Sequence, residues 1–139
     1  MAHFQTTISA EFSLGQGSSA GIKAENEDAI GIRIPDANLQ LTKGTVAVIA
    51  DGVSAAEAGK EASETCVQNF LADYYATPET WSVKKSSKQV LTALNRWLYS
   101  QGRHFPDQQK GYLTTFSSLI IKAQRGYLFH VGDSRIYRL

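Results

Sequence analysis

The segment 45–63 constrains the fold of this chain more than any other stretch, because it passes from a buried strand to a helix through an acidic residue. Residues 46–50 (VAVIA) form a short unbroken apolar run, the pattern of a strand buried on both faces. The run ends at Asp51, which is followed by a glycine. Ser54 and Glu57 have the spacing of a helix capping box, and apolar residues then recur at helical spacing. This order predicts a place that can hold a cation, although an isolated Asp-Gly pair is also typical of a simple turn.

Other acidic residues stand at the ends of predicted strands. Glu27 and Asp28 come just before the alternating strand 30–34, and Asp133 follows an apolar strand. Because a sheet brings strand ends together at its rim, these acids can meet Asp51 there. Carboxylate oxygens without a cysteine or a well-placed histidine suit magnesium or manganese rather than zinc. The alternative is a set of unrelated turn acids at sheet edges.

The remaining patterns predict a single α+β domain. Alternation of apolar and polar residues predicts strands, and apolar residues at helical spacing predict helices. The expected strands are 4–14, 30–34, 39–50 with a kink at Gly44, 115–122, 127–131 and 134–139, and the expected helices are 55–75 and 82–101. Strands before and after two helices favour α+β over alternating βαβ units. The last strand ends the chain without a polar tail, which we interpret as a cut through a larger domain.

Composition excludes several classes of protein. The 139 residues include 42% hydrophobic residues and carry a net charge of +1, which fits one domain with a real core and argues against a nucleic-acid binder that relies on a strong field. The single cysteine, Cys66, is interpreted as a small apolar filler and favours a reducing compartment. Neither a membrane-spanning run of roughly 20 apolar residues nor a secretory signal is present, so the predicted location is cytoplasmic.

Four sequence blocks, in order, carry a family resemblance. They are KAENED (23–28), ADG followed by AGKEAS (50–63), LTTFSSLII (113–121) and HVGDSRIYRL (130–139). Together they resemble the metal-dependent protein phosphatases of type 2C, from about residue 5 to the end. The resemblance implies a β-sandwich of two antiparallel sheets flanked by helices, in four layers (α-β-β-α), of which residues 1–139 would be the N-terminal portion. It also implies a binuclear manganese or magnesium centre at one end of the sandwich, with a third, weaker metal.

The resemblance assigns roles to individual residues. Asp51 would match the carboxylate that bridges both metals, and Gly52 the residue that gives a backbone carbonyl to one of them. Glu27 and Asp28 would match acids that hold metal-bound waters. Asp133, in Gly-Asp-Ser-Arg, would match the acid that helps to bind the third metal. The implied reaction is hydrolysis of phosphoserine or phosphothreonine in a phosphorylated protein by a water activated between two cations.

The chain departs from the family at three points. Lys23 stands where the family has an arginine that binds the substrate phosphate, and lysine lacks the bidentate fork. Val53 and the residues after it replace a histidine, which leaves the general acid unassigned. Two further metal-binding aspartates of the family lie beyond residue 139. We therefore expect these residues alone to form an incomplete site and to be a poor catalyst.

Two hypotheses follow from different classes of protein. The first is a signalling enzyme, a serine/threonine phosphatase domain. The second is a non-catalytic relative that keeps the fold for regulation or for binding a partner. The Asp51-Gly-Val-Ser variant also resembles bacterial phosphatase domains fused to a protein kinase, so a fused or cognate kinase is an expected partner. His130 is interpreted as a rim or core residue rather than a metal ligand.

Overall fold

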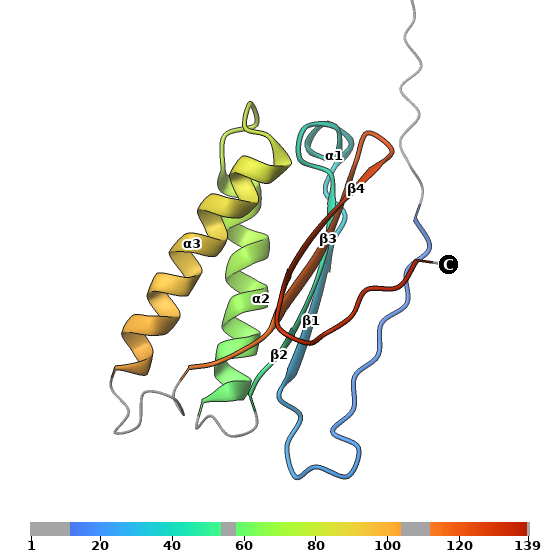
Figure 1. Ribbon diagram of the computed structural model, residues 1–139. Coiled ribbons are helices and arrows are strands. Elements are labelled where there is room, and N and C mark those ends of the chain that lie inside the picture. The colour runs from blue at the N-terminus through green and yellow to red at the C-terminus, as the bar shows by residue number, and fades with distance from the viewer. Residues whose placement is uncertain (1–11, 54–57, 104–111, 139) are drawn as a thin grey trace, which may run out of the picture.

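The computed structural model of the chain describes residues 12–53, 58–103 and 112–138. Figure 1 shows a twisted sheet with two long helices on one side. The elements, in chain order, are β1 (Asp28–Arg33), α1 (Ala37–Lys43), β2 (Thr45–Asp51), α2 (Gly59–Ala76), α3 (Val83–Gly102), β3 (Phe116–Lys122) and β4 (Arg125–Val131). The strands form one four-stranded sheet in the order β1-β2-β3-β4, with every neighbouring pair antiparallel. The α+β class is therefore confirmed.

One face of the sheet is covered by α2, and α3 packs on α2 (Figure 1). The residues of β2 alternate between the two faces, and Val46, Val48 and Ala50 are buried in the core. Phe70 and Tyr74 of α2 are fully buried against them. The apolar positions of α2 recur at helical spacing, so one stripe of the helix meets the sheet while the opposite side stays polar.

The opposite face of the sheet, here called the outer face, is also largely apolar. Ile49 and Leu128 remain 45% and 59% exposed there, and Ile30, Ile32 and Leu119 on the same face are partly buried. An antiparallel sheet that faces water usually places polar residues on that side. The apolar outer face is compatible with the expected sandwich, but the residues that the structure describes contain a single sheet. The second sheet and the four layers are thus not confirmed.

Several local predictions are confirmed. The helix predicted over 82–101 is α3, whose N-cap Ser82 accepts a hydrogen bond from the backbone N of Lys85 at 3.1 Å. The first long helix ends at Ala76, just before Pro78, as expected. The β3–β4 hairpin also forms, with a two-residue turn at Ala123 and Gln124, both at positive φ. Such turns match the twist of the two strands that they join.

The segment 37–43 corrects one prediction. Leu39 and Leu41 were expected to begin the strand that leads to Val46, but they lie in α1. The side chain of Asp36 accepts a hydrogen bond from the backbone N of Leu39 at 2.9 Å, which caps the helix. Gly44, at φ 81°, then ends the helix and lets the chain turn directly into β2.

Two other expectations are wrong, and some lie outside the described residues. The helix after Asp51 begins at Gly59, with Ala58 as its N-cap, rather than close behind Ser54. The proposed capping residues Ser54 and Glu57 are outside the described ranges, as are residues 4–11 of the first predicted strand. Residues 134–138 have no regular secondary structure, so the strand expected there is absent from the described part of the chain. The residues beside Asp133 instead contact Thr115, which lies just before β3, as described below.

Candidate active site

Asp28 and Asp51 face each other at one end of the sheet. They are the first residue of β1 and the last of β2, and the antiparallel register pairs them directly. Because Ala50 points into the core, Asp51 and its partner lie on the outer face. The pKa of Asp51 is raised, first by burial and then by a hydrogen bond with Asp28. The two carboxyl groups are therefore within hydrogen-bonding reach of each other.

Two further charged residues lie near this pair. The negative charge of Asp133, in the turn after β4, also raises the pKa of Asp51, while the positive charge of Lys23 lowers it. Lys23 comes from the segment before β1, where its backbone N donates to the carbonyl of Ala20 at 3.1 Å. The fold thus brings together four residues from separate segments that the sequence had proposed for one site: Lys23, Asp28, Asp51 and Asp133.

Gly52 is in a tightly packed position rather than in a flexible turn. Its backbone N donates to the carbonyl of Glu27 at 3.0 Å, and it forms an isolated antiparallel bridge with Thr114. A Cβ atom added at Gly52 would lie 2.2 Å from the carbonyl oxygen of Gly59, at the start of α2. The glycine is needed because the backbone of α2 passes directly over the end of β2. The simple-turn interpretation of Asp-Gly therefore does not describe this segment.

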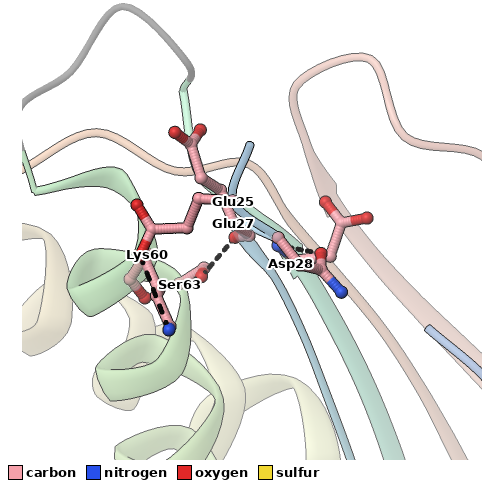
Figure 2. Close-up of polar contacts among 6 residues, drawn as sticks. Glu25, Glu27, Asp28, Lys60 and Ser63 are labelled. Atoms are coloured by element: carbon pink, nitrogen blue, oxygen red, sulfur yellow. Dashed lines mark hydrogen bonds and ion pairs between the residues drawn. The ribbon is translucent and has the colours of Figure 1, made fainter. Parts of the chain in front are cut away.

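Glu27 lies on the helix side of β1, opposite to Asp28. Figure 2 shows Glu25 and Glu27 beside Lys60 and Ser63 of α2, whereas the carboxylate of Asp28 points away from that helix. The hydroxyl of Ser63 donates to the backbone carbonyl of Glu27 at 2.6 Å, and Lys60 forms an ion pair with Glu25 at 3.5 Å. Glu27 therefore lines a shallow acidic hollow at the start of α2, together with Glu61 and Glu64. Its role beside the aspartates stays a prediction.

Sequence reasoning missed the polar contacts that hold the site in place. Thr115 had been identified only by resemblance, and Ser134 not at all, yet their hydroxyl groups lie 3.0 Å apart beside Asp51. The hydroxyl of Ser117 lies 2.7 Å from Nδ1 of His130 on the next strand, on the same face. His130 is an exposed residue of the outer face rather than a core residue. Alternation places Thr115, just before β3, and Ser117 on the same face, but it does not indicate what their hydroxyl groups contact.

The carboxylate oxygens of these acids are the type of ligand that a hard divalent cation prefers. The carboxyl groups of Asp28 and Asp51 lie close together, and a bound cation would relieve the repulsion between them. In addition, Oε2 of Glu27 is buried without a hydrogen-bond partner among the described residues. Within those same residues, however, no three acidic, histidine or cysteine side chains are gathered closely enough to ligate one ion. The acids therefore form a pair with a third nearby, and not a closed metal cage.

Comparison with known proteins identifies the family. No curated protein matches the chain significantly. The family model described as Protein phosphatase 2C, however, matches residues 19–139, which include Lys23, both members of the aspartate pair and Asp133. This match, over most of the chain, indicates a phosphatase. The chain belongs to the protein phosphatase 2C family.

Proposed function

We propose that this domain removes phosphate from phosphoserine or phosphothreonine in a protein substrate, with manganese or magnesium as its cofactor. The observation that supports this proposal best is the convergence of Asp28, Asp51 and Asp133 at one end of the outer face. Two acids from other segments, Asp28 and Asp133, beside the partly buried carboxyl group of Asp51 are electrostatically unfavourable unless a cation joins them. Perturbed carboxyl groups of this kind are typical of functional sites.

Each acid would have its own role in the reaction. Asp51 and the backbone carbonyl of Gly52 would hold the cations, with Asp133 contributing to a weaker one. When bound, divalent cations neutralise charge on phosphoryl oxygens and lower the pKa of water. Asp28, paired with Asp51, would orient the attacking water. Glu27 would hold a metal-bound water, as the resemblance implies.

Hydrolysis requires one bond exchange and two proton destinations. The water oxygen forms a bond to phosphorus while the bond from phosphorus to the serine or threonine oxygen breaks. One proton of the water ends on the leaving alcohol and the other stays with the phosphate, so the products are the alcohol and inorganic phosphate. Lys23 lies near Asp51 and would attract the substrate phosphate as a point charge, without the two parallel hydrogen bonds of an arginine.

The test is manganese-dependent hydrolysis of a chromogenic phosphomonoester and of a phosphothreonine peptide by the full-length protein that contains these residues. Asp51→Asn should lower the rate about 100-fold or more, because it removes the carboxylate that would hold the cations. Asp73→Asn is a matched control, since Asp73 is exposed near the other end of α2 and should retain full activity. Manganese binding is measured in parallel. A wild-type protein that neither binds manganese nor hydrolyses either substrate would overturn the proposal in favour of a regulatory or partner-binding role.

Other expectations about partners and location extend this proposal. A fused or cognate kinase would supply the phosphorylated substrate, and a cytoplasmic location would suit a single buried thiol. Within the described residues, no helix combines the length and apolar character required to cross a membrane.

A further inference from the structure

Thr115 contacts both segments that carry the central acids. We propose that Thr115 is a positioning residue, whose hydroxyl group ties the end of β2 to the turn after β4 and so fixes the spacing between the carboxylates of Asp51 and Asp133. The inference rests on the proposed function, because a cation is what that spacing would serve. Thr115 itself is not a ligand in this proposal.

The first half of the tie is a pair of hydrogen bonds to Asp51. The backbone N of Asp51 donates to Oγ1 of Thr115 at 3.0 Å, and the backbone N of Thr115 donates to the carbonyl of Asp51 at 2.8 Å. Both main-chain polar groups of Asp51 are thus bound to the same residue. This fixes the position of its Cα atom and the direction in which the carboxylate leaves the strand.

The second half of the tie reaches both neighbours of Asp133. Oγ1 of Thr115 lies 3.0 Å from the hydroxyl oxygen of Ser134. On the other side, Gly132 packs on the methyl group of Thr115 so closely that an added Cβ would lie 2.6 Å from Cγ2. Gly132 also has φ 107°, a conformation that other residues rarely adopt. Asp133 is therefore held between two residues that both contact Thr115.

A hydroxyl group is suited to this place because of its hydrogen-bonding capacity. It can accept from the Asp51 N–H with one lone pair while it shares its own proton with Ser134. A valine keeps the methyl group against Gly132 but loses both hydrogen bonds. A serine keeps both hydrogen bonds but loses the methyl group. The two variants separate the polar tie from the packing.

The experiment measures manganese affinity of the same full-length protein by electron paramagnetic resonance, which reports bound metal without turnover. Thr115→Val should weaken binding about tenfold or more, in the range seen when outer partners of metal ligands are removed. Thr115→Ser should stay within about twofold of wild type, and Ser134→Ala should weaken binding less than the valine variant. Thr77→Val is the matched control, because the Thr77 hydroxyl also makes partly buried hydrogen bonds, with Lys43 and Ser86, at a different place in the fold. If Thr115→Val binds manganese as tightly as wild type, or no more weakly than Thr77→Val, the proposal is wrong.

A second measurement needs no metal and distinguishes failure of this inference from failure of the proposed function. Hydrogen exchange by NMR should show a protected Asp51 amide in wild type, lost protection in Thr115→Val, and restored protection in Thr115→Ser. The chemical shift of the Asp133 amide should change only in Thr115→Val and in Ser134→Ala. If wild type binds no manganese but this pattern appears, the phosphatase proposal fails and the positioning role stands. If the Asp51 amide exchanges equally in all three proteins, the positioning role is refuted whatever the metal does.

Discussion

Lys43 is a fully buried lysine that ends α1. Its ammonium group donates to the hydroxyls of Thr77 at 2.6 Å and Ser86 at 2.8 Å, and lies 5.4 Å from the centre of the Tyr74 ring. Among the described residues no carboxylate forms an ion pair with it. Burial lowers the pKa of Lys43 from its ordinary value of 10.5, and the charge of Lys122 lowers it further. We predict that Lys43→Met stabilises the protein at pH 7.

The size of this effect follows from what the substitution removes. Two hydrogen bonds to a charged group are lost, each contributing roughly 1.5–3 kcal/mol. The unfavourable free energy of desolvating an ammonium group, several kcal/mol, is removed as well. Neither hydroxyl is left without a partner, because Thr77 still donates to the carbonyl of Tyr74 at 2.6 Å and lies 2.9 Å from Ser86. We expect a net gain of about 1–2 kcal/mol, which for a chain of this size raises Tm by about 4 °C per kcal/mol.

The pH dependence gives the sharper assay. A lysine whose pKa is lowered on folding binds fewer protons in the folded than in the unfolded state between its folded pKa and 10.5. The free energy of unfolding of the wild type therefore rises with pH in that window, by at most about 1.4 kcal/mol per pH unit. The advantage of Lys43→Met should shrink as pH rises, as measured by urea denaturation at pH 7, 8, 9 and 10. Lys88→Met, at an exposed position of α3, should show no such trend. A wild type that is more stable than Lys43→Met at pH 7, with a difference that does not change with pH, would refute the reasoning.

Three further predictions concern the site and its support. Gly59→Ala should cost about 1–3 kcal/mol of stability in urea denaturation, because its Cβ would lie 2.8 Å from a backbone carbonyl, whereas Gly15→Ala, with open space around it, should be neutral. Asp51→Asn should stabilise the metal-free protein near neutral pH. Because the pKa of Asp51 is raised in the folded state, the wild type loses stability relative to the variant as pH rises from 3.8 through the folded pKa. A difference in melting temperature between the two proteins that stays constant across this pH range would contradict the prediction. Tyr74→Phe should cost about 1–3 kcal/mol by removing a 2.6 Å hydrogen bond to a buried carbonyl at the end of α1, while the exposed Tyr99→Phe should change the melting temperature little.

The sequence by itself determined the elements whose signals are local. The bounds of α3 follow from apolar residues at helical spacing after Ser82, and the β3–β4 hairpin follows from alternation around a short turn. The four ordered blocks also identified the family, which the family match confirms. The sequence further named Lys23, Asp28 and Asp51 as members of one site, and their proximity in the fold agrees with it, although their roles stay predictions.

Only the tertiary structure decided how distant residues meet. Leu39 and Leu41 fit a strand by alternation, but a cap at Asp36 and the positive φ of Gly44 make the segment a helix. Hydrophobic spacing also gave no indication that Thr115 binds both sides of the aspartate site, since a threonine suits any strand. Such contacts depend on the register between β2 and β3 and on where the turn after β4 lies. Register is a property of the packed sheet, because it is set by which side chains the core accepts on each face.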